Sequence, residues 1–332
     1  MSIKSKKIKI VATGAYLPEK VSSDDLEKKY NLKAGWSEKF SGVANRHHAT
    51  FESNGYMGAR AIESALQNSD LDLKDIDLII SAGATFDFPL PNQACVTKSK
   101  LKDGFKYNIP SIDVDTSCLS FVTSFDIASK MMDNYQYKNV IIVTTELGSK
   151  GLNTKNPETL TLFGDAAVAI IVSCDELSES CYIKGSLKTY SEGVNHAIIR
   201  GGGNEFFFKD YEYDESLHSF KMDGINLLKL ARKETARFAN DFFDDVDFNI
   251  NEMDVVIPHQ ASKIGIALFK KIFDFEKGIV KDNLLNHGNC IAASIPLVLH
   301  QLIESGEIKR GDLCFLLGTS AGFSIGATLF RF

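Results

Sequence analysis

The 332-residue sequence lacks the cysteine spacing of a disulfide framework or a zinc site. Its six cysteines are scattered, and none belongs to a Cys-X-X-Cys pair. Unpaired thiols are typical of a reducing compartment, so we expect a cytoplasmic protein. The sequence also lacks a basic excess, since its formal net charge of -6 argues against a nucleic acid partner. It has no apolar run long enough to span a membrane, and no signal-peptide core follows its basic first residues.

What the sequence does have is an α/β pattern that occurs twice. Apolar residues at helical and strand spacing predict the elements of both halves. The expected strands are 8–13, 77–83, 139–145, 166–172, 253–257, 312–317 and 322–332, and the expected helices are 55–66, one after Pro91, 225–242, 262–273 and 291–304. Their alternation predicts α/β layers with a mainly parallel sheet. We therefore divide the chain into two similar halves, 1–175 and 176–332.

Cys118 is the first candidate for a catalytic group. An alternating apolar run precedes it and an apolar helical period follows it, so we expect this residue at a strand-to-helix turn. The free N–H groups at a helix start carry partial positive charge, which would favour the thiolate of Cys118. However, a lone cysteine among small apolar neighbours is more often a buried packing residue. From this segment alone, the nucleophile and the packing residue both remain open as interpretations of Cys118.

Two later motifs add an imidazole and an amide. His259 lies just past an expected strand in the motif Pro258-His259-Gln260-Ala261, where parallel α/β sheets gather functional groups. Asn289, in the motif Gly288-Asn289, precedes an expected helix. Taken singly, His259 is explained as a hydrogen-bonded core residue and Asn289 as a helix cap. Together with Cys118 they form a candidate catalytic set. A metal site at His287 and Cys290 would lack further ligands at suitable spacing.

On these motifs the sequence resembles the β-ketoacyl-acyl carrier protein synthase III family of thiolase-fold condensing enzymes, along nearly its whole length. Cys118, the histidine motif and Gly288-Asn289 match that family's active-site positions in order and spacing, and Phe163-Gly164-Asp165 matches another of its signatures. The resemblance implies a thiolase-like fold with two pseudo-repeated halves. It also implies stacked five-stranded sheets in an α-β-α-β-α arrangement, and a homodimer.

The resemblance further implies the chemistry. Cys118 would accept an acyl group from a thioester of coenzyme A or acyl carrier protein. His259 and Asn289 would stabilise the enolate formed when a malonyl thioester loses carbon dioxide, and backbone N–H groups of Cys118 and Gly322 would hold the oxyanion. No tightly bound cofactor and no metal are implied. The product would serve fatty acid initiation or a specialised lipid or polyketide pathway. The alternative is an acyltransferase that passes the Cys118-bound acyl group to another nucleophile without condensation.

The sequence departs from the family pattern around the nucleophile and in the C-terminal loop. Leu119 and Ser120 stand where the family usually has small residues beside the acyl pocket. The loop 318–323 contains Gly318 and Gly322, but only one of the family's usual three glycines is retained at the matching place. We therefore expect an altered loop shape.

The expected entrance for coenzyme A also departs from the pattern. Trp36 matches the tryptophan that stacks on adenine, but the family's usual arginines fall at Phe40, Pro157 and Ile264. Coenzyme A and a carrier protein thus both remain open as donor. The lysines of one expected helix and its end would form a patch for an acidic carrier protein, although a solvated helix face explains them equally well. These lysines are Lys263, Lys270, Lys271 and Lys277.

Overall fold

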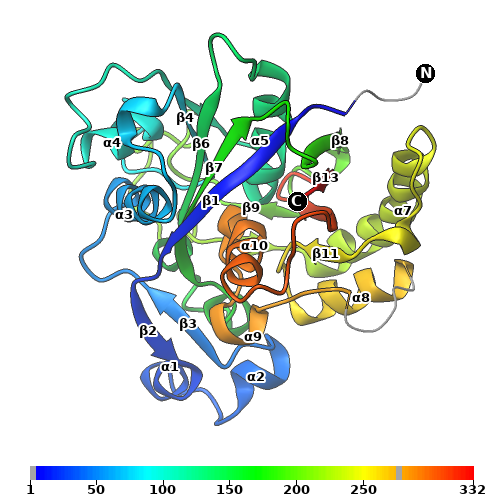
Figure 1. Cartoon of the computed structure of the whole chain (residues 1–332). Helices are drawn as coiled ribbons and strands as arrows, with labels where there is room; N and C mark the ends of the chain where they lie inside the picture. The colour runs from blue at the N-terminus through cyan, green and yellow to red at the C-terminus, as the bar shows by residue number, and fades with distance from the viewer. Residues whose placement is uncertain (1–4, 274–278) are drawn as a thin grey trace.

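Two β-sheets form the centre of the molecule (Figure 1). The computed structural model describes residues 5–273 and 279–332. The first sheet has the strand order β1-β7-β6-β4-β5 and the second has the order β11-β12-β13-β8. The strands of the first sheet are β1 (Ile8–Tyr16), β4 (Leu78–Ala82), β5 (Ser111–Val114), β6 (Asn139–Leu147) and β7 (Asp165–Cys174). Those of the second are β8 (Cys181–Thr189), β11 (Val255–Pro258), β12 (Leu313–Ser320) and β13 (Ser324–Arg331).

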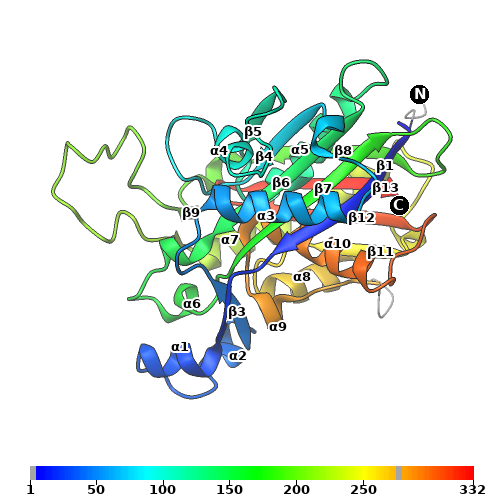
Figure 2. The same ribbon diagram turned by 60° about the vertical axis from the view of Figure 1, so that its left-hand side comes forward.

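Helices separate and cover the two sheets in five layers (Figure 2). The outer face of the first sheet packs against α3 (Asn54–Gln67) and α4 (Gln93–Ser99). Between the sheets lie α5 (Ser120–Met131) and α10 (Ser294–Glu304). The outer face of the second sheet packs against α7 (Gly224–Phe243) and α8 (Lys263–Phe273). This α-β-α-β-α order confirms the expected thiolase-like fold class.

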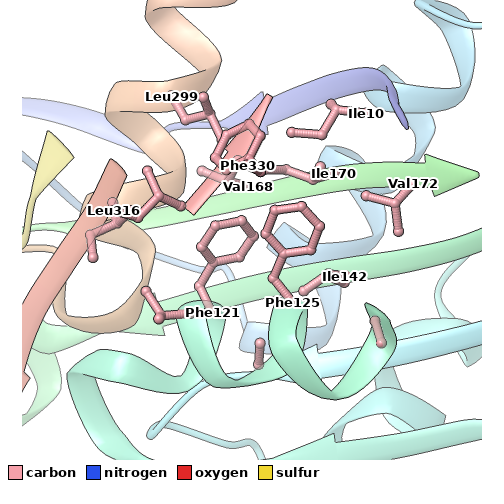
Figure 3. Close-up of a cluster of buried hydrophobic side chains, with 14 of the residues drawn as sticks. Ile10, Phe121, Phe125, Ile142, Val168, Ile170, Val172, Leu299, Leu316 and Phe330 are labelled. Carbon is pink, nitrogen blue, oxygen red and sulfur yellow. The ribbon is translucent and has the colours of Figure 1, made fainter. Parts of the chain in front are cut away.

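The helix α5 is buried in the middle layer because its apolar side chains pack against both sheets, and most of its polar side chains are small serines and threonines. Phe121 and Phe125 point toward the strand residues Val168 and Ile170 (Figure 3). The Phe125 ring also meets the edge of Phe330, with ring centroids 5.4 Å apart. The start of α5, and with it Cys118, is therefore held between the two halves of the molecule.

The first sheet is mixed and not mainly parallel as expected. The strand β4 runs parallel to β5 and β6, whereas β7 runs antiparallel to β6 and β1. A parallel return needs a crossover connection, which is usually a helix that covers the sheet. The connection from β6 to β7 contains only a 3₁₀ turn and the one-turn helix α6 (Pro157–Leu160). The chain therefore returns antiparallel.

The second sheet has four strands in the described part of the chain instead of the expected five. A fifth position at its edge is reduced to one parallel bridge between Val256 and Val280. Two hydrogen bonds make this bridge, from Val256 N–H to the Ile279 carbonyl (3.1 Å) and from Lys281 N–H to the Val256 carbonyl (2.9 Å). The polar sequence 281–283 follows directly, so within the described residues from 279 to 283 only Ile279 and Val280 are apolar.

The short hairpins and short helices lie around one end of the sheets (Figure 2). Two short hairpins pair β2 (Glu19–Ser22) with β3 (Asn45–His48) and β9 (Ala197–Ile198) with β10 (Lys221–Met222). Short helices are α1 (Ser23–Lys29), α2 (Trp36–Phe40) and α9 (Leu284–His287). The 3₁₀ segments are Leu73–Asp75, Ser117–Leu119, Gly148–Gly151, Ser191–Gly193, Ile250–Glu252 and Ile291–Ala293. Within the described ranges, no helix has the length and apolar character needed to cross a bilayer.

Candidate active site

One cavity brings the predicted thiol, imidazole and amide together. It has a volume of about 360 Å³ and is lined by Cys118, His259 and Asn289. The rest of its wall is largely apolar and includes Leu162, Phe163, Ile198, Phe220 and Met222. Cavities of this size and character are typical binding sites for small molecules. A single bound substrate can therefore contact all three groups.

Cys118 lies at the predicted strand-to-helix turn. The 3₁₀ segment Ser117–Leu119 follows β5 and leads directly into α5. Ser117 has a φ of 54°, a left-handed conformation that costs a non-glycine residue roughly 1–2 kcal/mol. The carboxylate of Asp115 holds it there by accepting a hydrogen bond from Ser117 N–H (2.7 Å). Backbone strain of this kind is concentrated at functional sites, which favours the nucleophile interpretation of Cys118.

The expected thiolate preference of Cys118 is wrong. Loss of water at the sulfur raises the pKa of Cys118 to about 11, and the nearby buried carboxyl of Glu146 acts in the same direction. Hydrogen bonds from Ser117 and from the N–H groups of Ala321 and Cys118 lower the pKa, but by less. The partial charge of the helix start therefore does not compensate for desolvation. Cys118 is a neutral thiol at rest.

This raised pKa predicts how alkylation of Cys118 depends on pH. Since only the thiolate reacts, the iodoacetamide rate at Cys118 is expected to rise about tenfold per pH unit from pH 7 to pH 10. A cysteine in a model peptide should level off near its ordinary pKa of about 8.5. The measurement is peptide mass spectrometry of the alkylated protein at each pH. A Cys118 rate that levels off below pH 8 would contradict the neutral resting thiol.

Glu146 is a buried group near the nucleophile that the sequence interpretation missed. It lies on β6, has no exposed surface, and accepts hydrogen bonds from Ala84 N–H and the Thr85 hydroxyl, both at 2.8 Å. Burial raises its pKa to about 8. Ala84 and Thr85 both line the cavity. The available signal was a single acidic residue near the end of a long apolar strand, which is unusual for a buried position.

His259 supplies a neutral imidazole to the cavity. Burial lowers the pKa of His259 to about 4, so its ring carries one N–H and one unprotonated nitrogen at neutral pH. Its backbone is fixed by a hydrogen bond from His259 N–H to the Leu317 carbonyl (2.8 Å). The ring nitrogen Nδ1 is buried and has no hydrogen-bond partner within the described residues. The structure therefore does not support the alternative of a hydrogen-bonded core histidine.

Gly318 on β12 leaves the space in which His259 lies. A Cβ atom at position 318 would be 2.7 Å from the His259 Cβ and 3.1 Å from the Leu119 Cδ2. We expect Gly318→Ala to displace the imidazole and to lower kcat by at least about tenfold, since misplacements near 1 Å cost up to about a hundredfold. The measurement is steady-state condensation kinetics. Gly203→Ala is the matched control, because no atom lies within 4 Å of a Cβ there. Equal kcat values for the two variants would contradict this positioning role.

The amide of Asn289 has a defined orientation. Its Oδ1 accepts hydrogen bonds from Ile291 N–H (2.8 Å) and from the Ser294 hydroxyl (3.5 Å). Its Nδ2 donates to the Ala261 carbonyl (3.2 Å). One N–H of the amide thus remains for a ligand in the cavity. Asn289 therefore both caps the turn that leads into α10 and presents a hydrogen-bond donor, so the two interpretations of the sequence hold together.

The Phe163-Gly164-Asp165 motif positions Asn289. Asn289 N–H donates to the Leu162 carbonyl (2.9 Å), and Gly164 N–H donates to the Asn289 carbonyl (3.1 Å). The two backbones approach so closely that a Cβ at Gly164 would lie 2.2 Å from the His287 carbonyl oxygen. One at Gly288, where φ is +69°, would lie 2.4 Å from the Leu162 carbonyl oxygen. Both glycines are thus needed for the two motifs to pair.

Comparison with known proteins decides the family. The curated β-ketoacyl-[acyl-carrier-protein] synthase III of Aquifex aeolicus (strain VF5) is 31% identical over 331 residues, which cover 98% of this chain and 99% of that protein. A protein of the same name from Neisseria gonorrhoeae is 31% identical over 334 residues, with the same coverage. The chain belongs to the β-ketoacyl-acyl carrier protein synthase III family. The expected family and the expected enzyme class, an acyltransferase of the condensing type, are confirmed.

Family models and solved structures agree with this membership. Residues 112–191 match the model for 3-oxoacyl-[acyl-carrier-protein (ACP)] synthase III, and residues 243–332 match the model for its C-terminal part. The crystal structure of the Aquifex aeolicus VF5 synthase III is similar, with a TM-score of 0.86 at 28% identity over 98% of this chain and all of that chain. The priming β-ketosynthase of the R1128 polyketide pathway has a TM-score of 0.87 over 100% of this chain and 98% of that chain, but at 20% identity it shows the fold alone.

The C-terminal loop, residues 318–323, places Ala321 beside the nucleophile. The backbone hydrogen bond that reaches the Cys118 sulfur from this loop comes from Ala321, and the loop residues that line the cavity are Thr319, Ser320 and Ala321. Gly322, the expected oxyanion donor, has a φ of +72° and does not line the cavity. Any residue type can supply a backbone N–H, so the missing glycines do not remove a donor here.

The structure places the other predicted site residues outside the cavity wall. The Trp36 indole packs against Phe40, with ring centroids 4.7 Å apart. Lys263 begins α8, and Lys271 lies near its end without an ion pair among the described residues. Lys270 instead pairs with Asp282 at 2.9 Å, while Lys277 lies outside the described residues. In the same described ranges, no three His, Cys, Asp or Glu side chains gather as a metal site requires.

Proposed function

We propose that this protein transfers an acyl group from a thioester donor to Cys118 and condenses it with a malonyl thioester on acyl carrier protein. The observation that carries the proposal is the shared cavity, which holds a thiol, a neutral imidazole and an oriented amide. The product is a β-ketoacyl thioester. It starts a chain in fatty acid synthesis or in a specialised lipid or polyketide pathway, depending on the acyl group.

Acylation begins when the Cys118 sulfur attacks the carbonyl carbon of the donor thioester. The carbonyl oxygen becomes an oxyanion, and the N–H groups of Cys118 and Ala321, which both donate to the sulfur in the resting enzyme, are the backbone donors for it. The intermediate collapses as the bond to the carrier sulfur breaks. The carrier leaves as a thiol after taking up the proton that Cys118 gave up, so no net proton is consumed. The apolar wall keeps water from hydrolysing the acyl-enzyme.

Condensation uses His259 and Asn289 together. The malonyl thioester loses carbon dioxide, and the electron pair of the broken C–C bond moves to the thioester oxygen as an enolate. The ring N–H of His259 and the free Nδ2–H of Asn289 donate to this oxygen. A neutral imidazole and an amide are both donors at pH 7 without titrating. The enolate carbon then attacks the acyl carbonyl, and the Cys118 thiolate leaves and takes up one proton from solvent, the proton that the decarboxylative condensation consumes.

This use of both donors favours condensation over simple acyl transfer. Transfer of an acyl group to another nucleophile needs the thiol and an oxyanion donor, which Cys118 and Ala321 already supply. A second pair of donors is needed when an enolate must also be stabilised. Asn289 is held in position by the paired motifs around Gly164 and Gly288, an arrangement that simple acyl transfer would not require.

The test is intact-protein mass spectrometry of the enzyme after exposure to a panel of acyl thioesters. A donor should add its acyl mass to Cys118, and malonyl-acyl carrier protein should then remove that mass and yield the β-ketoacyl product. If Cys118 is acylated but malonyl-acyl carrier protein does not discharge it, condensation is wrong and the acyltransferase alternative holds. Failure of every donor to acylate Cys118 would overturn the role of the nucleophile.

We also propose that the active form is a homodimer. The segment that follows the cavity residues Ala84 and Thr85 exposes three large apolar side chains, Phe86 (57%), Phe88 (55%) and Leu90 (86%). Exposed apolar groups of this kind next to an active site are typical of a surface that a partner covers. Sedimentation velocity should give twice the chain mass of 36.7 kDa. A monomer at micromolar concentration would contradict the proposal.

A further inference from the structure

An apolar and basic surface adjoins the active-site cavity. We call it the entrance patch and define it by the exposed side chains Phe40, Ile264 and Leu285, with Lys39 and Lys263 beside them. The three apolar side chains are 49%, 63% and 50% exposed. Lys39 lies over the Phe40 ring at 5.0 Å, and neither lysine has an acidic partner within 4.0 Å in the described chain.

Residues 41–44 hold the entrance patch together. A Cβ at Gly42 would touch the Lys263 side chain at 2.9 Å, which places this segment against the start of α8. Ala44 N–H donates to the Leu285 carbonyl at 2.7 Å, which ties the segment to α9. Figures 1 and 2 both show α2 beside α9 at this end of the molecule. The patch thus consists of parts of α2, α8 and α9.

The entrance patch continues into the cavity wall. Ala261, two residues before Lys263, lines the cavity, as do Leu162 and Phe163. Leu162 and Phe163 share a small apolar core with Val43, which is buried next to Gly42. A carrier that rests on the patch therefore lies within a short distance of the cavity that contains Cys118.

The patch lacks the groups that bind a nucleotide carrier best, although its two lysines could each contact a phosphate. Coenzyme A ends in an adenine and three phosphate groups, which are best bound by an open aromatic face and by the forked donors of arginine. Here the Trp36 ring is partly covered by Phe40, with ring centroids 4.7 Å apart. No arginine lies on α2, α8 or α9. Phosphates would also leave the exposed apolar side chains in water.

An acidic protein carrier matches the apolar and basic side chains of the entrance patch. Protein interfaces typically combine an apolar centre with a polar rim, and the patch has Phe40, Ile264 and Leu285 with lysines beside them. An acidic partner would gain from Lys39 and Lys263, which carry no opposing charge. We propose that the acyl donor reaches Cys118 on an acidic acyl carrier protein docked at the entrance patch, and not on coenzyme A. This inference rests on the proposed acylation of Cys118.

The experiment compares three carriers of the same acyl group. Octanoyl is attached to a bacterial acyl carrier protein, to coenzyme A and to pantetheine, and kcat/KM for acylation of Cys118 is measured with each. Steering by opposite charges raises association rates by about 10 to 10³, so we expect the carrier protein to exceed both other donors by at least tenfold. This advantage should shrink as ionic strength rises, because salt screens exposed charges.

Variants of the patch test its location. The measured quantity is the ratio of kcat/KM for the carrier-protein donor to that for the pantetheine donor. Lys263→Glu and Phe40→Ser should each lower this ratio by about fivefold to tenfold, and Glu38→Lys, which removes the one acidic side chain of α2, should raise it. The matched controls are Lys102→Glu and Phe105→Ser, exposed residues of the same types after α4, which should leave the ratio unchanged.

The outcomes separate this inference from the proposed function. Octanoyl-coenzyme A that acylates Cys118 as efficiently as the carrier-protein donor would overturn the inference, while the proposed function would stand. A ratio that changes as much in the control variants as in the patch variants would overturn the docking location. If no acyl group of the panel modifies Cys118 on any of the three carriers, the proposed function itself fails.

Discussion

Replacing Cys118 by serine is expected to lower the rate of product formation by on the order of 10³-fold or more. The cavity already raises the pKa of the thiol to about 11 by removing water from it. A hydroxyl ionises far less readily than a thiol, and the same desolvation would disfavour its anion further. Serine keeps the shape of the side chain but loses the nucleophile. The measurement is the rate of β-ketoacyl product formation with a donor that acylates the wild type.

Cys95→Ser is the matched control for this substitution. Cys95 lies on α4 and is exposed, and it does not line the cavity. Its variant should retain the wild-type rate within about twofold, as surface substitutions usually have small effects. Both variants should also unfold at the wild-type temperature. A Cys118→Ser enzyme that keeps a tenth of the wild-type rate would show that Cys118 is not the acyl carrier.

The local elements of this fold were predictable because apolar periodicity records which side of an element is buried. The helix expected at 225–242 is α7 (Gly224–Phe243), and the strand expected at 77–83 is β4 (Leu78–Ala82). Strand direction was not predictable in the same way. Whether β7 runs parallel or antiparallel to β6 depends on the path of the connection, and the 148–164 segment contains no periodic pattern that reveals it.

The positions of Cys118, His259 and Asn289 were predictable from motif order, but their protonation was not. The helix start beside Cys118 is visible in the sequence, whereas the loss of water that dominates its pKa comes from cavity residues of both halves. The same limit applies to the donor in the C-terminal loop. Which N–H faces the sulfur depends on backbone torsions, and Gly322 and Phe323 both have positive φ values of 72° and 49°. The turn that they form leaves Ala321 as the donor.

Asn289→Asp is expected to separate the two steps of the reaction. In the wild type, Ile291 N–H donates to the Asn289 Oδ1 at 2.8 Å. The aspartate carboxylate keeps this acceptor, so the turn into α10 should remain capped. It loses both N–H donors, and it places negative charge where the enolate oxygen develops. Removal of one such donor typically costs about 10² to 10³ in rate, so decarboxylation and condensation should fall at least that far. Acylation of Cys118 should remain within about tenfold of wild type, because it does not use this amide.

Asn92→Asp serves as the matched control for the amide. Its Nδ2 donates to the Ser111 carbonyl (2.9 Å) at the start of α4, and the residue does not line the cavity. The variant should therefore leave both steps unchanged. Asn289→Ala removes the cap as well as the donor, so it should also destabilise the fold by about 1 kcal/mol, measured by urea unfolding. If Asn289→Asp acylates normally and is still discharged by malonyl-acyl carrier protein at the wild-type rate, the enolate is stabilised elsewhere and the role of Asn289 reduces to its cap.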